Sequence, residues 1–552
     1  MPVLRPARSC RFAPRHAAAL AIPAFLLCAL GLFGAPGAAL AKPGDTKTFV
    51  ILHTNDQHGH LLPFSYPDRV SPGDDVAQMP VRKDIGGIAR RATLVKQIRA
   101  REKNVLLFDG GDCMDGTPFS TEFLGKADYD AMNGVGYDFA VPGNHDFNMT
   151  AAQFRELIGL VKFPYLVANL YQKDGGNDQR PLPPYKIVER DGLRVAVLGL
   201  TTYSGRTYKA AVEAYRMRDP VEVAREMVPE LRKQADLVAI VSHCGHEVEW
   251  QIAREVPGVD LIVGAHSHKR FPHAVYVAAD RPGPTDPPGT VYVQAHQWGG
   301  ELGRLDLTLR EQTDGRWCVS RYAPTLVPVT KQYAEDPQVA RTVARYWDQI
   351  KARYGAVVGQ ATGEFTEAIG QDYTNYYLVA DAVQQALGTQ FDLENRSGVR
   401  APILSGPITM GDIIGVDPFD NTLVTYKIKG ADLKRVLARW RPSTSASLRY
   451  EVRYEATAAG MGSGGTDAPR ATWRLVSATL DGKPIEDDAI YSGSANSFFF
   501  GRTIKPVALE SSDTGRLRRD VLTEYIRKNS PISPQADGRN KFIGADPFAR
   551  EQ

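Results

Sequence analysis

Short apolar runs rich in β-branched residues recur between residue 48 and about residue 330, and each run ends in polar or glycine-rich residues. Amphipathic stretches separate the runs, a pattern typical of buried strands joined by helices. The expected strands are Phe49–Leu52, Val105–Phe108, Phe139–Val141, Val195–Leu198, Leu237–Val241 and Leu261–Val263. This alternation predicts an α/β fold in which the loops after the strands lie along one edge of a sheet.

A helix and a second domain follow this series. The helix is predicted to open at Asp336 and to stop at Gly355. Its apolar residues share one face and are Val339, Val343, Trp347, Ile350 and Tyr354. We interpret the chain as a first domain at 42–332, a linker helix at 333–356 and a second domain at 357–552. Residues 63–84 are predicted to be a surface insertion, and residues 448–454 alternate as in a half-buried strand.

The first 41 residues have the pattern of a secretory signal peptide. Four arginines and no acidic residue stand there, and an apolar run at about 17–33 precedes an Ala-Leu-Ala at 39–41. This pattern predicts cleavage before Lys42 and export to the periplasm or, alternatively, secretion. A transmembrane anchor is the competing interpretation, but the apolar run is short for one. No later stretch approaches ~20 unbroken apolar residues, so we expect no stable membrane insertion.

Composition excludes two classes of protein. The chain has 66 basic and 63 acidic residues, but without the four arginines of the signal segment 62 basic residues face 63 acidic ones, a net charge of −1. A basic face for a nucleic-acid polymer therefore has no compositional support. Cys113, Cys244 and Cys318 remain after cleavage, so at most one disulfide forms and the chain is not a disulfide scaffold.

Histidine is distributed unequally along the chain. Of 11 histidines, ten lie between His53 and His296, and the second domain has none. Histidine is a common metal ligand and the usual general acid or base near neutral pH, so we assign the chemistry to the first domain. Compact polar groups follow five of the expected strands: Asp56-Gln57-His58, Gly111-Asp112, Gly143-Asn144-His145-Asp146, His243 and Gly264-Ala265-His266-Ser267-His268. Each group alone has a trivial explanation, but five in one chain are hard to attribute to chance.

These groups resemble the motif series of the calcineurin-like dinuclear metallophosphoesterases. Leu52–Asp56 and Gly86–Arg90 resemble its 5′-nucleotidase and 2′,3′-cyclic-nucleotide phosphodiesterase branch, and the resemblance covers nearly the whole mature chain. The similar strings of the second domain are Asn395-x-x-Gly398-Val399-Arg400, Gly406-x-Ile408-Thr409, Asp412, Pro418-Phe419-x-Asn421 and Gly430-x-x-Leu433. The implied fold is α/β: an N-terminal four-layer-type metallophosphoesterase sandwich followed by a smaller α/β (α+β) C-terminal substrate-binding domain.

The resemblance implies two divalent metal ions, zinc, manganese or similar. The implied ligands are Asp56, His58 and His268 for one ion, Asn144, His243 and His266 for the other, and Asp112 as the bridge. Two dications against two carboxylates leave about two positive charges, which suits a phosphate. A water or hydroxide between the ions is the implied nucleophile.

His145 is the implied catalytic histidine, which faces the phosphate or protonates the leaving oxygen; a packed structural histidine is the alternative. Many relatives orient this histidine with an aspartate three residues further on, where this chain has Asn148. Asparagine accepts a hydrogen bond but adds no charge, so we expect a pH profile different from that of aspartate-containing relatives. Asp146 is a further candidate in a supporting role.

The family's second domain implies that the nucleoside is clamped between two aromatic rings. Phe419 is the first expected ring, Asn421 a base contact and Phe498 the second ring, with Phe499 or Phe500 as alternatives if the register differs. A core aromatic is the alternative role for Phe419. Arg400 is expected to hold polar substrate groups. The family's Gly-Gly-Asp string is missing, and Arg502 lies in its vicinity, which leaves the exact substrate open.

The expected function is an exported hydrolase that releases phosphate from nucleoside 5′-monophosphates in nucleotide catabolism. One alternative uses the same metals as a 2′,3′-cyclic-nucleotide phosphodiesterase or a nucleotide-sugar pyrophosphatase. Another is an exported nucleotide-binding protein that has lost catalysis. We expect a nucleotide substrate as the partner, no nucleic-acid polymer, and a monomer or weak oligomer.

Overall fold

The structure is a computed structural model that describes residues 44–70, 74–174, 179–280, 289–366, 372–396, 398–456 and 471–544. The predicted signal peptide at 1–41 lies outside these residues. The described residues belong to one compact unit, Lys42–Gln552. None of their helices combines the length and apolar composition that crossing a membrane requires.

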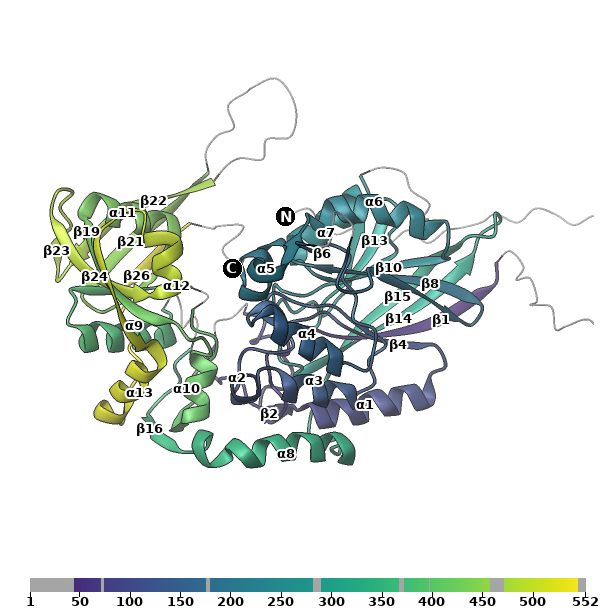
Figure 1. Ribbon diagram of the computed structural model, residues 1–552, viewed down its shortest axis with the longest axis horizontal. Coiled ribbons are helices and arrows are strands. Elements are labelled where there is room, and N and C mark those ends of the chain that lie inside the picture. The colour runs from purple at the N-terminus through teal and green to yellow at the C-terminus, as the bar shows by residue number, and fades with distance from the viewer. Residues whose placement is uncertain are drawn as a thin grey trace, which may run out of the picture. The chain divides into compact units, whose positions relative to one another are not determined.

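Two sheets form the centre of the first part of the chain (Figure 1). One has the order β15-β14-β1-β4-β5: β1 is Thr46–Thr54, β4 Val105–Asp109, β5 Phe139–Ala140, β14 Glu301–Glu311 and β15 Trp317–Pro328. The other has the order β12-β13-β11-β10-β8-β7: β7 is Tyr185–Arg190, β8 Leu193–Thr201, β10 Leu237–His243, β11 Leu261–Val263, β12 Val275–Ala278 and β13 Gly289–Val293. Strands β1, β4 and β5 run parallel, as do β8, β10, β11 and β13. The six strands predicted from the apolar runs are confirmed.

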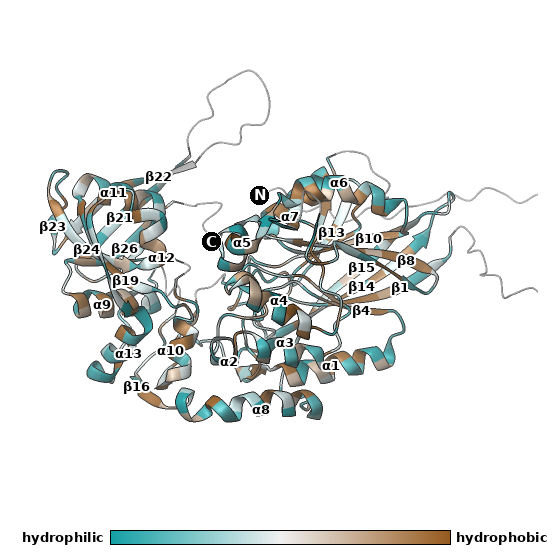
Figure 2. Ribbon diagram, viewed as in Figure 1, coloured by the Kyte–Doolittle hydropathy of each residue, from teal (hydrophilic) through white to brown (hydrophobic). Residues whose placement is uncertain are grey.

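Side chains of β1 alternate between two cores. Phe49 and Ile51 line a small cavity between the two sheets, together with residues of β4, β8 and β10. Val50 and Leu52 belong instead to the outer core under α1 (Ile88–Arg101). The second sheet packs on α6 (Pro220–Arg232) and α7 (His246–Glu255). Figure 2 shows hydrophobic residues along β4, β8 and β10 and mixed polarity on α1 and α6. Helices outside two stacked sheets are the four layers that were predicted.

Shorter elements complete this part of the chain and carry several loops of the site. The helices are α2 (Pro118–Phe123), α3 (Lys126–Asn133), α4 (Ala151–Leu160), α5 (Lys209–Ala214), η1 (His145–Phe147) and η2 (Tyr203–Thr207). The short strands are β2 (Pro63–Phe64), β3 (Ile85–Gly86), β6 (Leu170–Gln172) and β9 (Tyr215–Met217).

The predicted helix after the first domain is confirmed as α8 (Pro337–Tyr354). The side chain of Asp336 accepts hydrogen bonds from the backbone N–H groups of Gln338 and Val339, which satisfies the first turn. Gly355 is the C-terminal cap. Four of the five predicted apolar residues are buried: Val339, Val343, Ile350 and Tyr354.

The second part of the chain has its own sheets and helices. The strands of its five-stranded sheet, β20-β17-β24-β19-β25, are β17 (Phe391–Glu394), β19 (Thr422–Lys429), β20 (Ser443–Thr444), β24 (Ile490–Asn496) and β25 (Ala508–Leu517). Those of its four-stranded sheet, β23-β22-β21-β26, are β21 (Leu448–Ala456), β22 (Ala471–Leu480), β23 (Lys483–Pro484) and β26 (Asn540–Ile543). A pair joins β16 (Val357–Ala361) to β18 (Gly406–Thr409). The helices are α9 (Thr374–Leu387), α10 (Met410–Val416), α11 (Gly430–Trp440), α12 (Ser497–Phe499), the π-helix η3 (Phe500–Ile504) and α13 (Arg518–Asn529). Strand β21 confirms the alternation predicted at 448–454.

The segment 63–84 differs from the predicted surface insertion. Its first two residues pair with β3, and Tyr66 and Met79 are buried against Trp298. The rings of Tyr66 and Trp298 stack with centroids 5.1 Å apart. The surface prediction was wrong for Tyr66 and Met79. Most of the segment is polar, so these two buried apolar residues did not stand out in its sequence.

The three cysteines of the described residues are buried and form no disulfide. Cys113 belongs to the core under α1, and Cys244 to the core under α6 and α7. They act as small apolar residues, so the fold depends on core packing and not on a covalent bridge.

Candidate metal centre and substrate site

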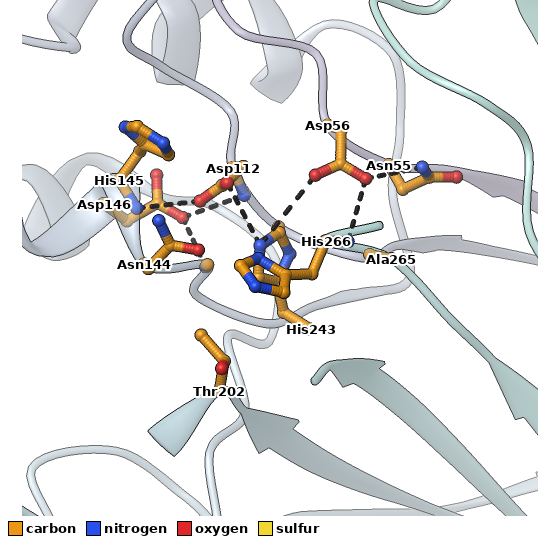
Figure 3. A network of polar contacts seen from close by, with 12 residues as sticks. Asn55, Asp56, Asp112, Asn144, His145, Asp146, Thr202, His243, Ala265 and His266 are labelled. Carbon is orange, nitrogen blue, oxygen red and sulfur yellow. Dashed lines mark hydrogen bonds and ion pairs between the residues drawn. The ribbon is translucent and has the colours of Figure 1, made fainter. Parts of the chain in front are cut away.

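The predicted ligands follow the carboxyl ends of parallel strands from both sheets. Asp56 and His58 follow β1, Asp112 follows β4, Asn144 precedes η1, His243 ends β10, and His266 and His268 follow β11. In Figure 3, Asp56, Asp112, Asn144, His243 and His266 point toward one another. The loops at these strand ends meet because parallel strands present their carboxyl ends at the same edge of a sheet.

The ligands fall into two groups. In one group, Asp56, His58 and His268 each offer a ligand atom within 4.8 Å of the other two, and Asp112, His243 and His266 do the same in the second. His243 Nε2 lies 3.1 Å from Asp112 Oδ2. The same Asp112 oxygen lies 3.8 Å from His58 Nε2, so this carboxylate contacts both groups. A bridging position between two ions is therefore open to Asp112.

Backbone carbonyls orient two of the imidazoles. His58 Nδ1 lies 2.9 Å from the carbonyl oxygen of Asp115, and His243 Nδ1 lies 2.7 Å from that of Gly110. A carbonyl oxygen only accepts, so each Nδ1 carries the proton and donates. Each Nε2 is then the ring nitrogen that faces the group of ligands and that can offer a lone pair to a metal ion, which is how proteins fix a metal-binding histidine.

Asn144 supplies the clearest sign that the site is built for a cation. Its Nδ2 donates to the hydroxyl of Tyr208 at 3.0 Å, which leaves Oδ1 facing the ligands. Within the described residues, the buried Oδ1 has no hydrogen-bond partner. A buried amide oxygen without a partner costs about 1–3 kcal/mol. A metal ion removes that cost, so this donor set fits the implied dications.

The carboxylates attract positive charge strongly. Burial raises the pKa of Asp112, but His243 and His145 outweigh burial and hold this pKa well below its usual range. Burial lowers the pKa of His243, yet Asp112 and Asp56 overcome it and raise this pKa to about 10. In the metal-free chain a proton on His243 thus balances the carboxylates, a role that divalent cations take over when they bind.

The backbone at the ligands is strained. Five of the seven have positive φ, between 46° and 71°: Asp56, His58, Asp112, His266 and His268. The left-handed region costs a non-glycine residue roughly 1–2 kcal/mol. Such strain gathers at functional sites, where the surrounding structure holds it.

His145 and Asp146 lie beside the bridging carboxylate. The backbone N–H of His145 donates to Asp112 Oδ1 at 2.8 Å. Asp146 Oδ2 accepts from the backbone N–H groups of Gly143 and Asp112, at 2.7 and 3.2 Å. Burial and the nearby Asp112 raise the pKa of Asp146 to about 7. Asp146 therefore ties two ligand loops together.

Asn148 is not placed as the predicted acceptor for His145. Its Nδ2 donates to Asp115 Oδ2 at 2.8 Å, and the same oxygen lies 3.2 Å from His145 Nδ1. Two residues of the site, Asp115 and Tyr208, were not predicted. Tyr208 has no motif signal, and the only signal for Asp115 is an acidic residue three positions after Asp112.

Two predicted substrate-binding residues of the second part contact the metal centre. Arg400 Nη2 lies 3.2 Å from His58 Nε2. The ring of Phe419 stacks on that of His145, with centroids 5.9 Å apart and planes 22° apart. The backbone carbonyl of Asn421 accepts a hydrogen bond from the backbone N–H of Arg518, which fixes the position of Asn421.

Phe498 is the ring of its neighbourhood that faces solvent. Its exposed fraction is 42%, whereas Phe499 and Phe500 are buried. The guanidinium of Arg502 lies 4.6 Å over the Phe498 ring and donates to Thr207 Oγ1. Arg502 thus covers one face of this ring, and the geometry favours Phe498 over the two alternatives.

A buried arginine connects the segments that carry these residues. Arg518 is completely buried and donates to the carboxylates of Asp417 and Glu394 and to the carbonyl of Gly398. Gly398 lies two residues before Arg400, and Asp417 two residues before Phe419. The segments that carry the two predicted substrate-binding residues are therefore held by one guanidinium.

Comparisons with known proteins show which families this chain is similar to. Residues 49–270 match the calcineurin-like phosphoesterase family, and residues 357–505 match the 5′-nucleotidase C-terminal domain. Protein UshA of Yersinia enterocolitica is 29% identical over 560 residues, which cover 91% of this chain and 95% of the relative. The 5′-nucleotidase of Vibrio cholerae is 27% identical over 544 residues, covering 88% and 91%. A 5′-nucleotidase precursor from Thermus thermophilus has a similar structure, with a TM-score of 0.76, 25% identity, and coverage of 91% of this chain and 100% of that one.

Proposed function

Since this chain belongs to the calcineurin-like phosphoesterases that carry a 5′-nucleotidase C-terminal domain, we propose that it hydrolyses nucleoside 5′-monophosphates to nucleoside and phosphate. It is a metal-dependent phosphoester hydrolase. The observation that carries the substrate class is the approach of Arg400 and Phe419 to His58 and His145, which puts a cationic and an aromatic contact beside the ligand groups. A phosphate with an attached base matches that pair of contacts.

The two ligand groups would hold two divalent ions, zinc, manganese or similar, and Asp112 would contribute to both sites. When bound, they supply a water nucleophile at neutral pH and neutralise the phosphate oxygens. Asp56 and Asp112 oppose four positive charges with two negative ones, so about two positive charges remain for the phosphate. This local charge replaces a basic surface, which the composition does not provide.

The chain's own residues bind and orient the substrate. Arg400 holds a phosphate oxygen next to His58. His145 faces the same phosphate and stabilises the transition state or protonates the leaving oxygen. Phe419 and Phe498 take the base between their rings, and Asn421 contacts its edge. Stacking of this kind tolerates every base, so we propose a broad preference among nucleotides.

We extend the proposal to the organisation of the chain. Residues 1–41 act as a signal peptide that directs the protein to the periplasm, 42–332 form the metallophosphoesterase domain, 333–356 the linker and 357–552 the substrate-binding domain. The mature protein acts as a monomer or weak oligomer. The Ala-x-Ala pattern before Lys42 and the separate sheets on either side of α8 support this division.

A substrate panel tests the proposal. Purified protein with added Mn²⁺ or Zn²⁺ is assayed against AMP, 2′,3′-cyclic AMP and UDP-glucose. AMP should be hydrolysed efficiently, with phosphate as a product. If AMP is the poorest substrate by orders of magnitude, the proposed substrate class is wrong.

A variant separates this site from any contaminating phosphatase. Asp112→Ala removes the shared carboxylate and should abolish turnover of every ester in the panel. Asp314→Ala, in an exposed turn between β14 and β15, is the matched control and should keep the activity of the parent protein. Unchanged activity of Asp112→Ala would place the reaction elsewhere.

A further inference from the structure

Asp115 lies in the turn after β4, three residues beyond Asp112, and its side chain is mostly buried. Its Oδ2 is 3.2 Å from His145 Nδ1 and accepts a hydrogen bond from Asn148 Nδ2 at 2.8 Å. A carboxylate oxygen cannot donate, so His145 Nδ1 carries the proton in this contact. The other ring nitrogen, Nε2, is left for the substrate side.

The backbone of the same residue holds a metal ligand. The carbonyl oxygen of Asp115 accepts from His58 Nδ1 at 2.9 Å. One residue thus fixes the rings of His58 and His145, whose centroids are 5.1 Å apart. The relative position of the first metal group and the catalytic histidine is set by this residue.

The turn that carries Asp115 is tightly constrained. Asp115 has φ of 67°, in the left-handed region that non-glycine residues avoid. A Cβ on the next residue, Gly116, would lie 2.5 Å from the carbonyl oxygen of His58. The chain accepts this conformation, which directs the Asp115 carboxylate toward His145 and its carbonyl toward His58.

We propose that Asp115 is the positioning residue of His145, and that Asn148 assists by holding the Asp115 carboxylate in place. This proposal rests on the proposed phosphoester hydrolysis and adds a residue to it. Asp115 acts through His145: it selects the tautomer and the ring orientation, in the way that a carboxylate orients the histidine of other catalytic sites. The sequence predicted that Asn148 contacts His145 directly. In the structure Asn148 contacts Asp115 instead, so it lies one contact further from the substrate.

A double-mutant cycle tests this role. Asp115→Asn keeps the size of the side chain and removes its charge. It should lower kcat on the order of 100-fold, the scale of a general acid or base contribution. KM should stay within about three-fold, because binding of the ground state does not use His145 tautomerism. In a His145→Ala background, Asp115→Asn should change kcat by less than about two-fold, because two residues that act as a unit are not additive.

Metal analysis and a second variant complete the test. Elemental analysis should find the same metal content in Asp115→Asn and the parent protein, since the backbone carbonyl toward His58 is retained. Asn148→Ala changes an exposed side chain, so the variant should fold like the parent protein. It should lower kcat by about three- to ten-fold in the parent background but should not lower it further in the Asp115→Asn background. Asp314→Asn is the control for the chemical change and should be without effect.

Three outcomes overturn the proposal: kcat of Asp115→Asn equal to that of the parent protein, an equal loss in the His145→Ala background, or a loss that parallels metal content. The substrate question is separable from this one. If the parent protein fails to hydrolyse AMP, the cycle is run on whichever ester of the panel it does hydrolyse, so failure of the substrate proposal does not decide the role of Asp115.

Discussion

At the scale of single residues, the site depends on side chains that hold the ligands in position. Tyr208 is the simplest case, because its hydroxyl accepts a hydrogen bond from the Asn144 amide N–H at 3.0 Å. Asn144 Oδ1, which has no hydrogen-bond partner among the described residues, then faces the ligand group. Without the hydroxyl, the Asn144 amide is free to rotate. Partners of this kind typically contribute 10–100-fold in metal affinity or activity.

Tyr208→Phe should therefore weaken metal binding at the site that contains Asn144. We expect the metal concentration for half-maximal activity to rise about 10-fold, with maximal activity restored at high metal. The measurement is activity against free Mn²⁺ set by a chelator buffer. Tyr203→Phe, in the adjacent 3-10 helix η2 and 42% exposed, is the control. Superimposable curves for Tyr208→Phe and the parent protein would contradict the assignment.

The sequence alone indicated the residues that form the two candidate ligand groups, because each of them follows a strand that an apolar run predicts. Asp115 and Tyr208 could not be found in this way. Tyr208 lies just after η2, and its distance of 64 residues from Asn144 is closed only by the tertiary fold. Asp115 touches His145 through a left-handed turn, and no periodic pattern encodes that conformation.

At the scale of elements, Arg518 at the start of α13 connects β17 to two loops that carry predicted substrate-binding residues. Its guanidinium donates to Glu394 at the end of β17, to Asp417 after α10 and to the Gly398 carbonyl. All of these groups are buried. Burial raises the pKa of Glu394, although Arg518 opposes the rise. Without the arginine, the buried carboxylates of Glu394 and Asp417 would lose their cationic partner.

Arg518→Met keeps most of the volume and removes the charge. Removing one partner of a buried ion pair costs about 3–5 kcal/mol, so the unfolding free energy measured in urea should fall by that order. KM for the nucleotide should rise more than kcat falls, because Arg400 and Phe419 lose their support while the metal ligands stay in place. The exposed Arg516, paired with Glu524, offers the control Arg516→Met. Equal stability of the two variants would show that the network contributes nothing.

Regular elements were the most predictable part of the fold. The helix α8 was found from one apolar face and its Asp336 cap, and β21 from its alternation. The π-helix η3 was not predicted, since Phe500–Ile504 has no pattern that distinguishes it from an ordinary helical turn. The burial of Tyr66 was missed because its partner Trp298 is more than 200 residues away in the sequence.

At the scale of the whole molecule, the candidate metal ligands and the predicted recognition residues lie in parts of the chain that have different hydrophobic cores. The cores under α1 and under α6 and α7 contain only residues before Pro337, apart from Val339 and Val343 of α8. The cores built on α9 and on β19 contain only later residues. The candidate metal ligands all lie in the part of the chain before Pro337.

Metal binding should therefore stabilise one half of the molecule more than the other. At 100 times the dissociation constant, a ligand stabilises its domain by about 2.7 kcal/mol, which corresponds to a rise in Tm of about 5–10 °C. In calorimetry of the chelated protein, adding Mn²⁺ should move one unfolding transition upward and leave the other nearly unchanged. In the Asp112→Ala variant the shift should be much smaller. Equal shifts of both transitions would mean that the two halves unfold together.

The left-handed backbone at Asp56 and Asp112 also has a consequence for how such a protein is inherited. Glycine adopts this conformation without steric cost, and aspartate codons become glycine codons by a single base change. Such a change removes the reaction, and it also relieves backbone strain, which offsets part of the cost of losing a buried hydrogen-bond acceptor. Selection for the reaction then does much to keep the two aspartates. In a lineage that obtains its phosphate or nucleosides by another route, the protein could keep its fold after it has lost its hydrolytic activity.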